Sequence, residues 1–140
     1  MTDVSPTREE AAAPGWQLLD RFFAAFTAAD LDQILALFWP DALVWGTTMP
    51  ALATGPAAVR AYFTAVGRRR PGERQASWTD GDALVLPETA ILVSGRWSVG
   101  PGPGEEGPVQ ALRLSLAVTR RGTEWRIGQF HSSPAVAPPP

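Results

Sequence analysis

His131 is the only histidine in the chain and stands near its end, in Phe130-His131-Ser132. A histidine has an ordinary pKa of about 6.5, so it can take up or give off a proton near neutral pH. One interpretation makes His131 a proton carrier that lines a pocket. The other makes it a structural residue of the last strand, bonded to Ser133 or to a neighbouring strand.

Arg113 lies in the middle of an apolar segment, with the small residues Ala111 and Ser115 beside it in the alternation. Small neighbours leave room for a ligand, and a guanidinium inside a pocket holds a carboxylate or an enolate oxygen. The alternative is a surface arginine on an exposed sheet face. The alternation slightly favours this alternative, because the leucine face of the same segment must belong to the core. We take His131 and Arg113 as catalytic candidates and Ser115 as a ligand-binding candidate.

Six tryptophans form a heavy aromatic load for 140 residues. Indole rings bury much apolar area, and their N–H groups need partners when buried. Trp45 and Trp97 stand in predicted strands that can line a cavity, and Tyr62 stands in a predicted helix, where its hydroxyl can polarise a ligand oxygen. These three residues predict a pocket for a flat, apolar or polyene-like molecule. The alternative is ordinary packing in the core or in a dimer interface, which we favour for Trp16 and Trp125.

Arg68, Arg69 and Arg70 form the one run of charges. They follow a predicted helix, and a cation near a helix C-terminus stabilises it by about 0.3–1 kcal/mol. The run is therefore interpreted as a solvated helix end. A docking patch for an acidic partner, such as a carrier protein, is the alternative.

Composition excludes several classes of site. The chain has no cysteine and one histidine, which excludes disulfides, thiolate metal sites and multi-histidine metal sites within the chain. We expect no metal and no cofactor. The net charge of -2 gives no electrostatic reason to expect nucleic acid. No segment has the length and apolarity of a membrane span or a signal peptide, so we expect no membrane partner and a cytoplasmic location.

Three segments in the first half of the chain have helical periodicity. Asp30 is a good N-cap for the second of them, and Pro40 is expected to end it after Phe38. Pro56 suits the first position of the third. The predicted helices cover about residues 14–29, 31–38 and 56–67.

The second half of the chain is predicted to form strands. Asp80-Gly81-Asp82 is interpreted as a turn, and the glycine- and proline-rich segment 100–108 as a hairpin loop. Within residues 109–121, leucines alternate with small or polar residues, which is typical of a strand with one buried face. The predicted strands cover about residues 42–47, 75–79, 83–86, 88–99, 109–121 and 124–133.

Helices followed by a run of strands predict an α+β domain, with helices packed on a curved antiparallel sheet. The domain is expected to cover residues 14–133. Residues 1–13 carry no apolar pattern and are interpreted as a flexible arm. Residues 134–140 are rich in proline and are interpreted as a tail that joins neither a helix nor a central strand.

The order of these segments resembles the SnoaL-like group of NTF2-like (cystatin-fold) domains. The resemblance rests on four segments: Phe22 to Phe38, Asp41 to Gly46, Gly55 to Phe63, and Trp125 to Ser133. It implies an NTF2-like cone, with three N-terminal helices against a curved sheet that encloses a pocket. Many members carry two histidines in the closing strand. Here Gln129 takes the earlier position, and we count it among the ligand-binding candidates.

The resemblance does not fix the activity, because this fold carries isomerases, cyclases, dehydratases, binding modules and assembly domains. The chain is also similar to the SgcJ/EcaC group, which is associated with enediyne and related polyketide pathways. Cofactor-free isomerases of this fold need a carboxylate base in the cavity, and Glu88 is the nearest candidate here.

Three functional hypotheses follow. The first is an accessory protein that binds a polyketide-like small molecule and assists a pathway enzyme. The second is a cofactor-free isomerase or cyclase that uses His131 as base, with Arg113 or Tyr62 polarising an oxygen. The third is an assembly module whose sheet face dimerises. A homodimer is expected in any case, because a sheet covered by helices on one side tends to hide its other face.

Overall fold

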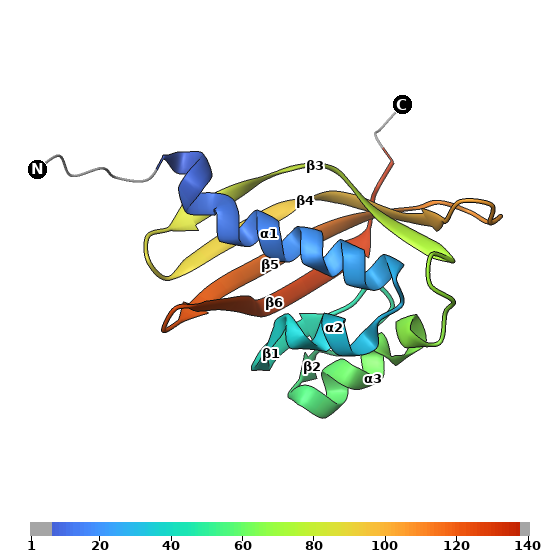
Figure 1. Ribbon diagram of the computed structural model, residues 1–140, viewed down its shortest axis with the longest axis horizontal. Coiled ribbons are helices and arrows are strands. Elements are labelled where there is room, and N and C mark those ends of the chain that lie inside the picture. Colours follow the sequence, from blue (N-terminus) through green and yellow to red (C-terminus); the bar gives the residue numbers. More distant parts are fainter. Residues whose placement is uncertain (1–6, 138–140) are drawn as a thin grey trace, which may run out of the picture.

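The computed structural model describes residues 7–137, which form helices and one six-stranded sheet. In chain order the elements are α1 (Arg8–Thr27), α2 (Leu31–Ala36), β1 (Phe38–Trp45), β2 (Ala53–Thr54), α3 (Pro56–Gly67), β3 (Arg74–Leu86), β4 (Ala90–Pro101), β5 (Gln110–Arg121) and β6 (Glu124–Pro134). The strands lie in the order β2-β1-β6-β5-β4-β3. α1 runs along one face of the sheet, and α2 and α3 lie at its β1 and β2 end (Figure 1). The α+β class is confirmed.

α1 begins six residues before the predicted start at Pro14. Thr7 caps the helix by accepting a hydrogen bond from the backbone N–H of Glu10 at 3.1 Å, and the Glu10 carboxylate accepts one from the N–H of Thr7 at 3.3 Å. This reciprocal cap satisfies N–H groups of the first turn, and the helix continues through Pro14. The prediction of a flexible arm is therefore wrong for residues 8–13. Residues 1–6 and 138–140 lie outside the described residues.

The second helix is shorter than predicted. Its cap is confirmed, since the backbone N–H of Gln33 donates to Asp30 Oδ1 at 3.1 Å. The helix ends at Ala36, however, and Phe38 already belongs to β1, where it pairs with Ile127 of β6. Pro40 does not end a helix but lies within β1, where the register with β6 shifts. A proline is tolerated at such an irregularity because no ladder hydrogen bond requires its missing N–H.

The sheet is antiparallel at every neighbouring pair of strands within residues 7–137 except one. β1 runs parallel to β6, with Val44 opposite Phe130 and Trp45 opposite His131. The prediction of a wholly antiparallel sheet is wrong at this pair. A parallel pair needs a long connection, and α3 together with four strands separates β1 from β6 along the chain.

β3 continues through the Asp-Gly-Asp segment at 80–82, which the sequence predicted as a turn. Gly81 faces Gly95 of β4, and the register shifts between Trp78 and Asp80. A Cβ on either glycine would overlap the indole of Trp78. The two glycines therefore make room for a ring beside a β-bulge and do not reverse the chain. The bounds of β4, β5 and β6 agree with the predictions to within two residues.

The two faces of β5 have different surroundings, as its alternation predicted. Leu112, Leu114, Leu116 and Val118 are buried in the core. Arg113 and Ser115 lie on the opposite face and are exposed. That opposite face, here called the outer face, is not covered by any helix of residues 7–137 (Figure 1). Within the same residues, no helix has the length and apolarity needed to cross a membrane.

Candidate functional site

A cavity of about 280 Å³ lies between α1, α3 and the inner face of the sheet. Small-molecule sites commonly measure about 300–1,000 Å³, so the cavity lies just below this range and suits a compact ligand. Its aromatic wall comes from helix and strand positions that share the buried face. The lining residues are Phe22, Phe26, Thr47, Thr48, Tyr62, Phe63, Ala65, Val66, Arg69, Trp97, Val99, Gln110, Leu112 and Phe130.

Phe22 is the centre of the aromatic wall. It is fully buried, and its ring centroid lies 5.9 Å from Phe63, 6.0 Å from Trp97 and 5.3 Å from Phe130. Phe26, one helical turn later, packs its edge against Trp97 at 5.8 Å. Edge-to-face contacts at these distances stabilise the rings in fixed orientations. One side of the cavity is therefore a rigid aromatic surface.

A chain of polar groups crosses the other side of the cavity. Ser132 of β6 is 2% exposed, and its Oγ accepts a hydrogen bond from Trp97 Nε1 at 3.2 Å. Ser132 Oγ also lies 2.7 Å from Thr47 Oγ1, with which it shares a hydrogen bond. The backbone N–H of Thr47 in turn donates to the hydroxyl of Tyr62 at 3.2 Å. The chain links β4, β6, the segment after β1 and α3, so it fixes the relative positions of four elements that border the site.

Tyr62 reaches the cavity from α3 because Gly46 makes room for it. A Cβ on Gly46 would overlap the Tyr62 ring. Burial raises the pKa of the Tyr62 hydroxyl above its usual value, and the hydrogen bond from Thr47 opposes this only in part. Tyr62 is therefore a neutral hydrogen-bonding group at physiological pH.

Arg69 is the charged residue of the cavity wall. It lies just after α3, and its guanidinium carbon stands 5.1 Å from the centroid of the Phe26 ring. Its Nη1 is buried and has no hydrogen-bond partner among the described residues. Burial lowers the pKa of this guanidinium, and the positive charge of Arg74 adds to the effect. The cavity wall thus contains a cation, and no group of the described chain forms a hydrogen bond with its Nη1.

The two other arginines of the run have different surroundings. Arg70 pairs with Glu105 at 3.0 Å and with Glu73 at 3.4 Å, and Arg68 is exposed. The three arginines of the run therefore have three different environments.

The structure places two of the predicted site residues in the cavity wall, Tyr62 and Trp97. Trp97 is buried and Tyr62 is half-buried. Their roles in ligand binding stay predictions. The two catalytic candidates do not reach the cavity: His131 and Arg113 are both exposed on the outer face. Their predicted position inside a pocket is wrong, because the leucines of β5 take the inner face.

The remaining predicted residues also lie on the outer face. Ser115 stands opposite His131 and bonds to Ser94 Oγ at 2.9 Å, and Gln129 is exposed one position along the same face. Trp45 is 41% exposed, and its ring centroid is 6.2 Å from that of His131. The predicted positions of these three residues in a pocket are wrong for the same reason. Trp45, His131 and Ser115 are neighbours, but on an open sheet surface.

The prediction missed Arg69, Thr47 and Ser132. One signal for Arg69 is its spacing: Tyr62, Val66 and Arg69 fall four and then three residues apart, which places them on one helix face. Ser132 follows Phe130 by two residues, so it shares the buried face of β6. Thr47 lies after the end of β1, where no periodicity applies, and no sequence signal marks it.

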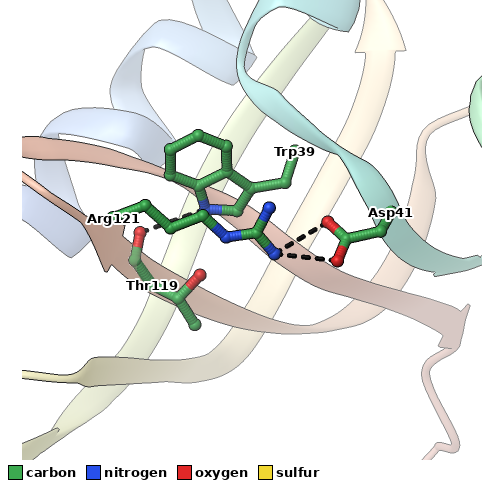
Figure 2. A network of polar contacts seen from close by, with 4 residues as sticks. All are labelled: Trp39, Asp41, Thr119 and Arg121. Carbon is green, nitrogen blue, oxygen red and sulfur yellow. Dashed lines mark hydrogen bonds and ion pairs between the residues drawn. The ribbon is translucent and has the colours of Figure 1, made fainter.

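A second polar cluster lies away from the cavity and is structural (Figure 2). Arg121 Nη2 donates to both carboxylate oxygens of Asp41, at 2.8 and 2.9 Å, and its guanidinium lies 4.6 Å from the Trp39 ring centroid. Trp39 Nε1 donates to the carbonyl oxygen of Thr119 at 3.2 Å. The hydrogen bond from Arg121 holds the pKa of Asp41 below its usual value. The cluster ties β1 to β5, and its charged groups already pair with each other.

Residues 7–137 contain no group of three or more histidine, cysteine or acidic side chains arranged to hold a metal ion. The groups that can contact a molecule in the cavity are its aromatic wall, its polar chain and Arg69.

A family model described as SnoaL-like domain matches residues 16–137. Among curated proteins, none matches the chain. Several solved structures share the fold. An NTF2-like protein of unknown function from Pseudomonas putida is 19% identical, with a TM-score of 0.77 over 88% of this chain and 85% of that one. A putative dehydratase of the NTF2-like family from Streptomyces avermitilis is 18% identical, with a TM-score of 0.76 over 94% of this chain and 100% of that one.

A third similar structure, a ketosteroid isomerase-like protein from Erwinia carotovora, is 12% identical, with a TM-score of 0.73 over 94% of this chain and 100% of that chain. At these identities the likeness shows the fold alone. The fold of the chain is NTF2-like, also called cystatin-like.

Proposed function

The chain belongs to the SnoaL-like family, and on that premise we propose that it binds a small organic molecule with a flat apolar body in the cavity between α1, α3 and the sheet. The observation that carries this proposal is the cavity of about 280 Å³, walled by aromatic rings on one side and by hydrogen-bonding groups on the other. Such a combination gives affinity through apolar burial and orientation through a few polar contacts.

The contents of the cavity wall favour binding over catalysis by the predicted residues. Its lining residues, all within the described part of the chain, include no aspartate, glutamate or histidine. A cofactor-free isomerase needs a base within reach of the substrate proton. His131 and Arg113 stand on the outer face, so the geometry does not support the hypothesis that they act on a molecule in this cavity.

We place the protein in secondary metabolism, as an accessory protein of polyketide biosynthesis, with an enediyne-type pathway as the narrower proposal. Support comes from the resemblance to the SgcJ/EcaC group and from the aromatic wall, which suits fused rings or polyenes. A pathway enzyme that hands over or receives such a molecule is the partner that this role implies.

Calorimetric titration tests the binding proposal. The purified protein is titrated with a panel of flat neutral probes that includes 2-naphthalenemethanol and the polyketide anthraquinone emodin. We expect saturable binding, and we expect Val66→Phe to abolish it, because Val66 lines the cavity and a larger ring fills the space. Circular dichroism checks that Val66→Phe still folds. Absence of binding across the panel, or equal binding by the filled variant, contradicts the proposal.

A second candidate function is assembly through the outer face, which we propose as the surface of a homodimer. The supporting observation is a row of exposed apolar side chains across the sheet, where Leu84 pairs with Leu92 and Leu92 with Ala117. Leu84 is 57% exposed and Leu92 is 37% exposed. Contiguous exposed apolar surface on a sheet is typical of an interface.

Light scattering tests the homodimer. We expect twice the chain mass of 15.0 kDa, and we expect Leu92→Arg to return the protein to the single-chain mass. The control is Val109→Arg, which adds the same charge just before β5 at a residue that is 66% exposed. A wild-type mass near 15.0 kDa refutes the dimer.

A further inference from the structure

Arg69 differs from the arginines of residues 7–137 that pair with acidic groups. Arg60, Arg70, Arg96, Arg121 and Arg126 each pair with an acidic side chain, and those pairs are solvent-exposed or partly so. Arg69 makes no ion pair within the described residues, and its Nη1 is buried without a hydrogen-bond partner there. A buried cationic donor without an acceptor is costly. Such a residue in a cavity wall is explained if the missing acceptor belongs to a ligand.

Packing positions the Arg69 guanidinium at the cavity. Its carbon lies 5.1 Å from the Phe26 centroid, so the planar group rests on a ring that is itself part of the aromatic wall. Glu73 is the acidic residue that attracts Arg69, but its carboxylate pairs with Arg70 at 3.4 Å. No acidic residue of the described chain therefore forms an ion pair with Arg69.

Tyr62 offers a second donor to the same cavity. Its hydroxyl accepts a hydrogen bond from the backbone N–H of Thr47 at 3.2 Å. That bond uses a lone pair of the hydroxyl oxygen, so Tyr62 can still donate its O–H proton to a ligand. Tyr62 lies in α3, and Arg69 lies two residues after the end of this helix, seven residues later in the chain. Both line the cavity.

We propose that the ligand of this cavity is an anion, an aromatic or polyene carboxylate or a stabilised enolate, whose negative oxygens bind Arg69 and Tyr62 while its flat body packs on Phe26 and Trp97. This inference rests on the proposed function, because it assigns a chemical class to the molecule that the cavity binds. A guanidinium matches a carboxylate with two parallel N–H bonds, which explains the choice of anion over a neutral polar group.

The experiment compares two probes that share one ring system. Calorimetry at neutral pH measures the dissociation constants of 2-naphthoate and of the neutral 2-naphthalenemethanol. We expect the wild-type protein to bind 2-naphthoate about tenfold more tightly or better, since a hydrogen bond to a charged group contributes about 1.5–3 kcal/mol and each 1.4 kcal/mol is tenfold. Arg69→Gln is expected to remove this preference while leaving the neutral probe within about twofold.

Two further variants keep the test decisive. Arg68→Gln removes the same charge one residue away, at an exposed site outside the cavity, and is expected to leave both constants unchanged. Arg69→Lys keeps the charge without the planar fork and is expected to retain part of the preference, even if the glutamine variant folds poorly. Circular dichroism of each variant shows whether it folds.

The outcomes separate the inference from the proposed function. The anion inference is overturned if the wild type binds the two probes with equal affinity, or if Arg69→Gln lowers the affinity for both probes equally. Either result leaves the binding function standing. Equal loss in Arg68→Gln and Arg69→Gln overturns the anion inference as well, because the effect is then one of general charge. If neither these two probes nor any other member of the panel binds the wild-type protein, both proposals fail.

Discussion

Replacing Ser132 with alanine tests whether the polar chain beside the cavity is a connected unit. Ser132 is 2% exposed, accepts from Trp97 Nε1 at 3.2 Å and lies 2.7 Å from Thr47 Oγ1. Alanine leaves the indole N–H of Trp97 buried without an acceptor, and such an orphaned donor costs about 1–3 kcal/mol. Thr47 is half-buried, so water replaces its lost partner at little cost. We therefore expect Ser132→Ala to lower the free energy of unfolding by about 1–3 kcal/mol.

The assay is urea denaturation followed by circular dichroism, because one partner variant removes a fluorophore. Trp97→Phe removes the indole N–H donor, so adding Ser132→Ala to this variant leaves no buried indole N–H without an acceptor. We expect the second substitution to cost about 1 kcal/mol less in this background than in the wild type. Ser133→Ala is the matched control, half-buried beside Ser132, with an expected change within about 0.5 kcal/mol. Equal costs of Ser132→Ala in the two backgrounds refute the reasoning.

Three further substitutions test the remaining structural arguments. Gly46→Ala places a Cβ inside the Tyr62 ring, so we expect a lower Tm, a free energy of unfolding lower by about 1–3 kcal/mol, and weaker probe binding by calorimetry. Tyr62→Phe is expected to leave the affinity for the neutral probe unchanged. Arg121 lowers the pKa of Asp41 from its usual 3.8, so the Asp41 carboxylate is harder to protonate in the folded state than in the unfolded state. The folded state is therefore stabilised above pH 3.8, and this stabilisation is lost as the pH falls through the folded-state pKa of Asp41. Asp41→Asn should flatten the fall of Tm on acidification, and an unchanged Tm profile contradicts the argument. Gly95→Ala pushes a Cβ into a carbonyl oxygen of the neighbouring strand, and unfolding should show a loss of about 3 kcal/mol.

Much of the fold is predictable because periodicity reports burial. The leucines of β5 and the phenylalanines of α1 identify the buried faces by their spacing alone, and both sets are buried as expected. Asp30 marks the start of α2 by a local hydrogen bond. These features depend only on residues close in sequence, which is why the sequence contains them.

The errors have the opposite origin, in partners that lie far away in sequence. The Asp-Gly-Asp segment at 80–82 has the local chemistry of a turn, yet Gly81 pairs with Gly95 on the next strand, 14 residues later. Phe38 continues an apolar helix pattern, yet it pairs with Ile127, 89 residues later. Tertiary pairing overrides the local preference at both places, and no pattern within a short window reveals it.

The site illustrates a further limit of reasoning from periodicity. The leucine argument already implied that Arg113 points outward, but only the register of β5 with β6 shows that His131 shares that face with Ser115. A strand shifted by one residue would have exchanged the two faces, and nothing in the composition of β6 fixes the register.

The groups that decide the chemistry of the cavity come from places where periodicity ends. Arg69 lies two residues after the end of α3, and Thr47 lies two residues after the end of β1. Both side chains line the cavity and are half-buried, so each can reach a ligand and still meet solvent. The regular positions of α1, β4 and β6 instead supply Phe22, Trp97 and Phe130, which bury apolar area. Apolar packing therefore shapes the cavity. Under the proposed function, the residues at element ends select its ligand, which is why Arg69→Gln is expected to alter the preference between probes without destroying the cavity.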